Sequence, residues 1–170
     1  LVNELEANGV TVLQDETVLL DDSYHMVTID RQRRTVIRRS IAFIDRRDGR
    51  LVGQLRLDAN LHQLSIRHMA IDARGRVWFG CQYRGPEGDR PQLVGYATMD
   101  GDIRLVELPP DTLGDLRNYV GSVAVSGDGQ RIAVSSPEGN LLVVVDAGTG
   151  QQITVEGLRN GCGLAADGEG

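Results

Sequence analysis

The sequence predicts an all-β protein made of β-propeller blades, with about three four-stranded antiparallel sheets that belong to a larger propeller. Short aliphatic and β-branched segments recur along the chain, and glycine-containing turns separate them, which is the pattern of β-hairpins. The same succession of segments returns after about 50 residues, a period typical of propeller blades. A β-sandwich also has a turn about every 8–12 residues, but the longer period favours the propeller.

The first hairpin of the repeat appears twice. The copies are "HMAIDARGRVWFGCQ" at 68–82 and "SVAVSGDGQRIAVSS" at 122–136, and they can be laid over each other residue by residue. Each has a strand, a turn with glycine and a second strand. The tripeptide Pro-Glu-Gly follows in both, at 86–88 and at 137–139.

The third and fourth strands follow in the same order in both copies. Their segments are "LVGYATM" (93–99) and "IRLVEL" (103–108) in the first, and "LLVVVDA" (141–147) and "QITVEGL" (152–158) in the second. Two whole blades are therefore expected at about 62–109 and 118–158. Only the segment at 111–118 is suited to a helical turn.

Partial copies flank the two whole ones. The segment "IAFIDRRDGRLVGQLRL" (41–57) fits the last two strands of a blade, within a blade at about 10–60 whose first part fits least well. The segment "VTIDRQRRTVIRR" (27–39) is suited to a hairpin of an earlier blade. A further blade begins at 160–170. Propellers typically have about 4–8 blades, so we expect residues 1–170 to form one partial propeller domain, or a chain that assembles with another copy.

Composition excludes several classes of protein. The net charge of −6 argues against a nucleic-acid partner, because binding phosphates needs a basic face. No apolar run approaches the roughly 20 residues of a membrane span. The two cysteines, Cys81 and Cys162, make no disulfide framework. We expect both to be free, because an intervening blade should hold them farther apart than the roughly 7 Å between Cα atoms that a disulfide allows.

Motifs that require catalysis are missing from the sequence. It has no zinc spacing such as CxxC or HExxH, no GxSxG elbow and no phosphate-binding loop. We therefore predict no catalytic residue and no metal ligand, and no cofactor is indicated. The pair Asp21-Asp22 could bind a cation, but an exposed turn is the simpler explanation.

Three segments lead into the innermost strands of successive blades. They are "LHQLSIRH" (61–68), "LRNYVG" (116–121) and "LRNGCG" (158–163), called the lead-in segments below. In a propeller such segments lie on one face near the central channel, where polar groups from separate blades converge into a binding site. Gln63 is brought to the same region. The candidate ligand-binding residues are His62, Arg67, His68, Asn118, Tyr119, Asn160 and Cys162.

Each candidate has a structural alternative. His62 and His68 should face the same side of one strand, but the roughly 20 Å between them is too far for one metal ion. His68 then packs between blades and His62 lies in a loop. Arg67 is suited to an anion or carboxylate clamp, or to a salt bridge between blades.

The remaining candidates are open in the same way. Asn118 and Tyr119 could bind a ligand through amide and hydroxyl, or serve as a turn residue and an aromatic between blades. Cys162 lies between two glycines and is either reactive or structural, whereas Cys81 is expected to be a buried inert thiol.

Several of these segments resemble a known family. They are "HQLSIRHMAID" (62–72), "FGCQY" (79–83), "LRNYVGSVAV" (116–125) and "CGLA" (162–165), and they resemble the bacterial domain-of-unknown-function family 1513 over about 40–170. Ala7-Asn8-Gly9 is similar to a segment of that family. The resemblance implies a seven-bladed propeller of about twice this length, exported by the twin-arginine (Tat) route to the periplasm. Genes of such proteins tend to lie beside imelysin-like and dihaem oxidase-like genes, so the resemblance also implies iron uptake or other metal handling in the cell envelope.

The function expected from the sequence is therefore a periplasmic scaffold. It would bind a partner protein or a small ligand in an envelope metal-handling system. One alternative is a propeller enzyme with a redox or hydrolytic site at the channel mouth, although no motif requires it. Another is a purely structural platform for protein interactions, since the fold alone does not define function.

Overall fold

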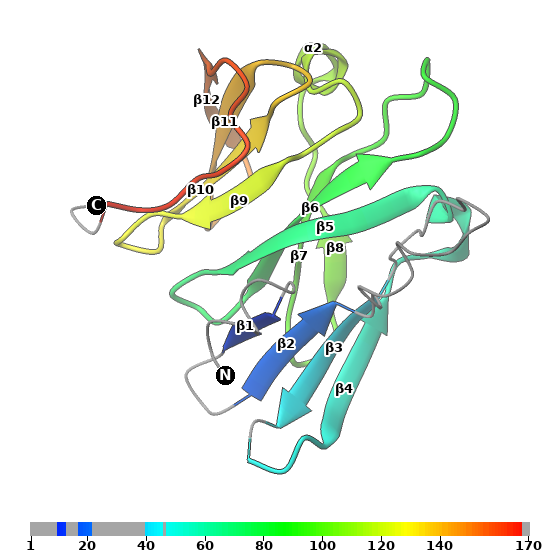
Figure 1. Ribbon diagram of the computed structural model, residues 1–170, viewed down its shortest axis with the longest axis vertical. Helices are drawn as coiled ribbons and strands as arrows, with labels where there is room; N and C mark the ends of the chain where they lie inside the picture. The colour runs from blue at the N-terminus through cyan, green and yellow to red at the C-terminus, as the bar shows by residue number, and fades with distance from the viewer. Residues whose placement is uncertain (1–9, 13–16, 22–39, 46, 168–170) are drawn as a thin grey trace.

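The computed structural model describes residues 10–12, 17–21, 40–45 and 47–167, and within them the protein is all-β with three four-stranded antiparallel sheets (Figure 1). Each sheet uses four strands that are consecutive in the chain, which confirms the predicted fold class. The sheets are β1 (Val10–Val12), β2 (Thr17–Asp21), β3 (Ser40–Asp45) and β4 (Leu51–Arg56); β5 (Leu64–Ile71), β6 (Val77–Tyr83), β7 (Val94–Ala97) and β8 (Ile103–Leu105); and β9 (Ser122–Val125), β10 (Arg131–Ser136), β11 (Leu141–Asp146) and β12 (Gln152–Gly157).

Helical structure is limited to short connections in this part of the chain. A 3-10 turn, η2 (Ala59–Leu61), precedes β5, and one helix, α2 (Pro110–Asp115), connects β8 to β9. Proline at the start of α2 suits the first helical turn, where its missing N–H is not needed. This helix lies where the sequence predicted a helical turn. None of the helices in the described ranges is long and apolar enough to cross a membrane.

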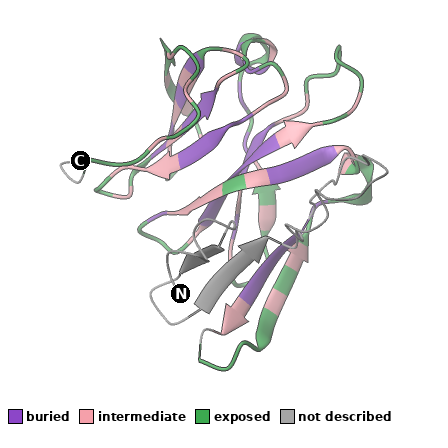
Figure 2. Ribbon diagram, viewed as in Figure 1, coloured by how far each residue is buried: buried purple, intermediate pink, exposed green. Residues whose placement is uncertain are grey.

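Burial follows from the position of each strand among the sheets. In β11 buried and half-buried residues alternate, as expected for a strand that has only one covered face. In β6, by contrast, Val77 to Cys81 are all buried, because the β5–β8 sheet lies between the other two. Figure 2 shows long buried stretches in β3, β6 and β10.

The first strands of neighbouring sheets pack together, β9 against β5 and β1 close to β5. Gly80 of β6 makes the interface with β9 possible, because a side chain at this position would overlap Val120 and Val123. First strands that face one another are the inner strands of propeller blades, so the sheets are blades in arrangement as well as in strand order.

The turns of the two whole copies each contain the same kind of main-chain hydrogen bond. Gly75 N donates to Asp72 O at 3.0 Å, and Gly129 N donates to Ser126 O at 2.8 Å. Both glycines have positive φ, 75° and 70°, a conformation that favours glycine.

The second hairpin is one residue longer than the first. Asp72 N bonds to Arg76 O, whereas Ser126 N bonds to Arg131 O. The residue-by-residue alignment expected from the sequence is therefore wrong by one position beyond the turn. Arg76 corresponds to Arg131, and Trp78 corresponds to Ala133 instead of Ile132.

Some predictions fall outside the described residues. They are the hairpin at 27–39, the similarity at 7–9, and Asp22 of the proposed cation pair. The blade limits, the single partial domain and the larger propeller stay predictions.

Candidate functional site

Two of the lead-in segments meet at the end of β6. Tyr83 N donates to Asn118 O at 2.9 Å, and Val120 N donates to Cys81 O at 2.9 Å, so the segment before β9 extends along β6. Arg84 N donates to Gln63 O at 2.8 Å and brings in the segment before β5. Residues far apart in the sequence are thus joined at one corner by main-chain hydrogen bonds.

We call the side chains gathered there the Tyr83 corner. It contains Gln63, Tyr83, Asp89 and Asn118, together with the main chain of Glu87. The Tyr83 hydroxyl donates to Asp89 Oδ2 at 2.7 Å and lies 3.3 Å from Gln63 Oε1. The bond to Asp89 raises the pKa of Tyr83, because ionisation would lose this bond and place two negative charges side by side.

Asn118 is the most constrained residue of the Tyr83 corner. Its φ is 59° and that of the preceding Arg117 is 53°, and consecutive left-handed residues other than glycine are uncommon in proteins. The Asn118 carbonyl accepts the bond from Tyr83, and its Nδ2 donates to Glu87 O at 3.3 Å. Its Oδ1 is buried and has no hydrogen-bond partner among the described residues. Buried polar atoms are normally paired, and this oxygen can accept one further hydrogen bond.

Tyr119 and His62 lie next to this corner. Tyr119 is half-buried and forms an isolated β-bridge with Gln82. His62 is exposed and ends η2 in helical conformation, one residue before Gln63. Tyr119 directly follows Asn118 in the sequence, and His62 directly precedes Gln63. Each is therefore adjacent to a residue of the Tyr83 corner.

Arg67 and His68 lie farther along β5. The register of β5 on β6 shifts between Ile66 and His68, so Arg67 is the extra residue of a β-bulge. The bulge and the helical turn at His62 break the extended path that was expected to put His62 and His68 on one side. His68 is exposed and pairs with Gly80, and its packing between blades stays a prediction.

The charge of Arg67 influences the pKa of the Cys81 thiol. Complete burial raises the pKa of the Cys81 thiol well above its ordinary range, and the positive charge of Arg67 opposes this rise. A buried thiol with a raised pKa is a poor nucleophile, which supports the interpretation of Cys81 as inert.

Asn160 and Cys162 lie at the corresponding end of the β9–β12 sheet. Asn160 N donates to Asn140 Oδ1 at 3.0 Å, and no hydrogen bond joins Asn160 or Cys162 to the Tyr83 corner within the described ranges. Cys162 is exposed, and both cysteines are free, which confirms the predicted absence of a bond between them.

No three His, Cys, Asp or Glu side chains gather to hold a metal ion in the part of the chain that the structure describes. The groups that line the Tyr83 corner are amide, hydroxyl, carboxylate and carbonyl. They can accept and donate hydrogen bonds, and the buried Asn118 oxygen favours a ligand or partner that supplies a donor.

Tyr83, Glu87 and Asp89 were not among the residues chosen from the sequence. Glu87 belongs to the repeated Pro-Glu-Gly tripeptide, which was visible as a repeat but had no assigned role. Tyr83 and Asp89 have no counterpart signal in the second copy, where β10 ends at Ser136 and Pro137 follows. The contacts of Asn118 across the blades identify Tyr83 and Glu87. The bond from the Tyr83 hydroxyl identifies Asp89.

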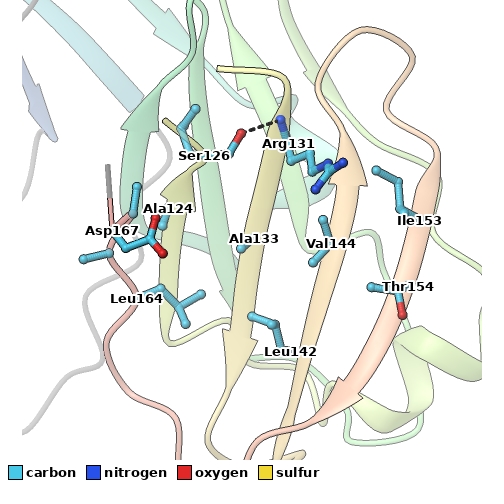
Figure 3. Close-up of a pocket in the computed structure, with 13 residues that line it drawn as sticks. Ala124, Ser126, Arg131, Ala133, Leu142, Val144, Ile153, Thr154, Leu164 and Asp167 are labelled. Carbon is cyan, nitrogen blue, oxygen red and sulfur yellow. Dashed lines mark hydrogen bonds between the residues drawn. The ribbon is translucent and has the colours of Figure 1, made fainter. Parts of the chain in front are cut away.

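A separate hollow lies on the face of the β9–β12 sheet (Figure 3), with a volume of about 510 Å³. Small apolar residues of β9, β10 and β11 form its floor, and the segment Leu164–Asp167 borders it. The residues that line it are Ala124, Val125, Ser126, Arg131, Ala133, Leu142, Val144, Ile153, Thr154 and Leu164 to Asp167. None of the candidate residues from the sequence lines this hollow.

Comparisons with known proteins agree with this architecture. The sequence model of the family described as "Protein of unknown function (DUF1513)" matches residues 31–170. A search of curated proteins returned no significant match.

Three solved structures, one of them described as a β-propeller domain, are similar in fold. Hydrazine synthase of Kuenenia stuttgartiensis is 20% identical over 81% of this chain and 39% of its own, with a TM-score of 0.54. A calcium-binding protein, regucalcin, from Agrobacterium tumefaciens is 17% identical over 95% and 50%, with a TM-score of 0.57. The β-propeller domain of Swd1 from Myceliophteria thermophila is 12% identical over 94% and 44%, with a TM-score of 0.55. The chain thus spans half or less of the length of these structures, and the likeness concerns the fold alone.

Proposed function

Since the chain belongs to the DUF1513 family of proteins of unknown function, we propose that it is part of a periplasmic β-propeller that binds a partner protein or a small ligand at the Tyr83 corner. The observation that carries the proposal is Asn118, whose buried Oδ1 has no hydrogen-bond partner among the described residues. The ligand or partner supplies an N–H or O–H donor to this oxygen.

The surroundings of Asn118 support binding. The residue is anchored to two loops, through Tyr83 N and Glu87 O, so its amide is held in place before any ligand arrives. A preorganised acceptor loses little conformational entropy on binding. The left-handed backbone at Arg117 and Asn118 is a strained conformation of a kind that clusters at binding sites.

Periplasmic location and a role in envelope metal handling are parts of the same proposal, and the resemblance to the family supports them. Because the described residues gather no metal ligands, this part of the protein would act in such a system by holding a partner or a small molecule. We do not assign a calcium site by analogy to regucalcin, since that similarity is one of fold.

The test uses the full-length protein, purified without a tag from the cell envelope of its own bacterium. Native mass spectrometry detects any retained small molecule or protein, and elemental analysis detects iron, copper and zinc. Asn118→Gly keeps the left-handed backbone and removes the amide. Asn140→Gly is the matched control, because Asn140 is also left-handed (φ 56°) but its Oδ1 already accepts from Asn160 N.

We expect the wild-type protein and Asn140→Gly to retain the same molecule and Asn118→Gly to lose it. Equal retention by both variants would exclude Asn118 as the binding residue. A transition metal bound in stoichiometric amount would instead favour the propeller enzyme. Recovery of the wild-type protein only from the cytoplasmic fraction would contradict the periplasmic location.

A further inference from the structure

The connection between β6 and β7 folds back over the Tyr83 corner. Its residues 85–91 read Gly-Pro-Glu-Gly-Asp-Arg-Pro and contain no apolar side chain apart from the two prolines. Residues 86–90 are exposed, and Gly85 and Pro91 are half-buried. A segment with so little buried apolar surface is held in place mainly by polar contacts, so it opens at a small cost in free energy.

Both ends of this segment are fixed to the main chain beside it. Before it, Arg84 N donates to Gln63 O at 2.8 Å. Behind it, Gln92 Oε1 accepts from Leu108 N at 2.8 Å, and Gln92 Nε2 donates to Leu108 O at 3.4 Å. The chain between these two anchors can therefore move while β6 and β7 stay in place.

The tip of the segment is braced within itself. Arg90 Nη1 donates to Glu87 O and, at 2.9 Å, to Asp89 O. Asp89 N donates to Pro86 O at 3.0 Å. These bonds do not depend on the rest of the protein, so residues 86–90 can move as one unit.

Among the described residues, two side-chain hydrogen bonds hold this unit on the corner. The Tyr83 hydroxyl donates to Asp89 Oδ2 at 2.7 Å, and Asn118 Nδ2 donates to Glu87 O at 3.3 Å. The second bond is long, so the bond from Tyr83 contributes most of the attachment. Gly85 fits closely beside it, because a Cβ at this position would overlap the Tyr83 hydroxyl.

The unit lies on the acceptor that carries the proposed function. Nδ2 and Oδ1 belong to the same amide of Asn118, so a segment bonded to Nδ2 also restricts the approach to the buried Oδ1. Opening breaks the bond to Glu87 but leaves the bond from Tyr83 N to Asn118 O. Asn118 therefore keeps its position while its side chain becomes accessible.

We propose that residues 85–91 are a lid over Asn118 Oδ1, that the bond from Tyr83 to Asp89 is its latch, and that the lid opens to admit the ligand or partner and then closes over it. Lids of this kind move on hinges of a few residues at their ends, and Gly85 lies at one of these ends. The inference rests on the proposed function for what enters, but the opening itself is measured without a ligand.

Limited proteolysis of the full-length protein measures the opening. Trypsin cleaves after arginine but not before proline, so the bond Arg84–Gly85 reports on the lid and the bond Arg90–Pro91 resists cleavage. The rate of cleavage follows the open population when closing is fast relative to cleavage. Mass spectrometry of the fragments assigns each cut.

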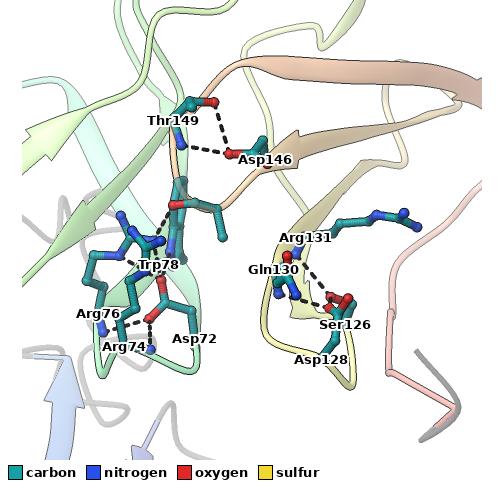
Figure 4. A network of polar contacts seen from close by, with 11 residues as sticks. Asp72, Arg74, Arg76, Trp78, Ser126, Asp128, Gln130, Arg131, Asp146 and Thr149 are labelled. Atoms are coloured by element: carbon teal, nitrogen blue, oxygen red, sulfur yellow. Dashed lines mark hydrogen bonds and ion pairs between the residues drawn. The ribbon is translucent and has the colours of Figure 1, made fainter.

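The bond Arg74–Gly75 is the matched site in the same sheet, at the β5–β6 turn (Figure 4). Arg74 N donates to Asp72 Oδ1 at 2.9 Å. Arg76, which ends this turn, donates through Nη2 to the main-chain oxygen of Ala147 in the following sheet. Cleavage at Arg74–Gly75 requires loss of this packing, so it reports on general destabilisation.

Tyr83→Phe removes the latch and keeps the ring. We expect it to raise the rate of cleavage at Arg84–Gly85 about three- to tenfold, the factor that a hydrogen bond typically contributes to an equilibrium constant. Cleavage at Arg74–Gly75 should stay the same. Tyr96→Phe is the matched control, because Tyr96 packs against Trp78, and it should not change the rate at Arg84–Gly85.

A second variant opens the lid without touching Tyr83. Gly85→Ala should also raise the rate of cleavage at Arg84–Gly85, because the new Cβ overlaps the Tyr83 hydroxyl. Gly88→Ala is its control in the same segment, since a Cβ at Gly88 has no neighbour within 4 Å. The rate in Gly88→Ala should equal that of the wild-type protein.

Unchanged cleavage at Arg84–Gly85 in both Tyr83→Phe and Gly85→Ala would overturn the lid, and so would an equal rise at Arg74–Gly75. Native mass spectrometry then follows the molecule that the wild-type protein retains. Faster loss of it on dialysis of both variants supports gating, and equal loss from variants and wild type contradicts it. If the wild-type protein retains no molecule, the proposed function fails, whereas cleavage still decides whether the lid opens.

Discussion

Asp72 and Arg76 form a buried ion pair, with 2.7 Å between Arg76 Nη2 and Asp72 Oδ2, and their side chains are 14% and 0% exposed for Arg76 and Asp72 respectively. The same carboxylate accepts bonds from Trp78 Nε1 at 2.8 Å and from Arg74 N at 2.9 Å. One acidic residue thus fixes the hairpin turn, the Trp78 ring and the arginine that reaches the next sheet.

Replacing Asp72 by alanine should therefore destabilise the protein strongly. Removing one partner of a buried pair leaves the other charge uncompensated and costs about 3–5 kcal/mol. Asp102→Ala is the control, because its pair with Arg104 is more than half exposed on both sides and should contribute about 0–1 kcal/mol. Urea unfolding of the full-length protein measures both. Similar losses in the two variants would contradict the central role of Asp72.

Acid should destabilise the protein partly through Asp72. Burial raises the pKa of Asp72, but hydrogen bonds from Trp78 and Arg76 outweigh burial and hold the pKa below its ordinary value. A carboxylate with a lowered pKa stabilises the fold above its unfolded pKa of about 3.9, and this contribution is lost as pH falls through the folded pKa.

The free energy of unfolding should thus fall from about pH 5 downward, and Asp72→Asn should reduce the slope. Asp45, Asp128 and Asp146 also have lowered pKa values, so part of the slope should remain in the variant. An identical slope in wild-type protein and Asp72→Asn would show that this carboxylate is not involved.

Gly80 should not tolerate a side chain. A Cβ there would overlap Val120 and Val123, and overpacking of this kind costs about 1–3 kcal/mol. Gly88→Ala is the matched control, because a Cβ at Gly88 has no neighbour within 4 Å, and its effect should stay below about 1 kcal/mol. If thermal or urea unfolding shows Gly80→Ala to be as stable as Gly88→Ala, the two sheets do not pack as described.

The two thiols should differ sharply in reactivity. Cys162 is exposed and should react with a maleimide in the native protein, whereas Cys81 is buried and its raised pKa keeps it protonated at neutral pH. Mass spectrometry should find one label on the native full-length protein at Cys162 and a second label at Cys81 only in denaturant. Prompt native labelling of Cys81 would mean that β6 is accessible.

Much of the fold could be predicted because it depends on local patterns. The repeat, the glycine turns and the alternation of apolar residues specify hairpins within about 15 residues of chain. The extra residue between Ser126 and Arg131 could not be predicted, because a turn of four or five residues leaves the same apolar strands on either side. That single insertion changes which residues of the two sheets correspond.

The candidate site was predictable only in part. The lead-in residues Asn118 and Tyr119 follow from the strand order of a blade, which places them at the end of the preceding sheet. Their partners Tyr83 and Asp89 depend on how two loops from one sheet meet the main chain of the next. Likewise, the bond from Arg76 to Ala147 joins residues 71 positions apart, and no local pattern in the sequence indicates it.

The binding role of Asn118 is tested most directly by a crystal structure of the full-length protein isolated from its own cell envelope. We predict that density for a bound molecule or partner chain places a donor within about 2.7–3.2 Å of Asn118 Oδ1, with Tyr83 and Asp89 still bonded beside it. If this oxygen instead accepts a bond from another part of the same chain, or from a water molecule alone, the account of the Tyr83 corner as a binding site is contradicted.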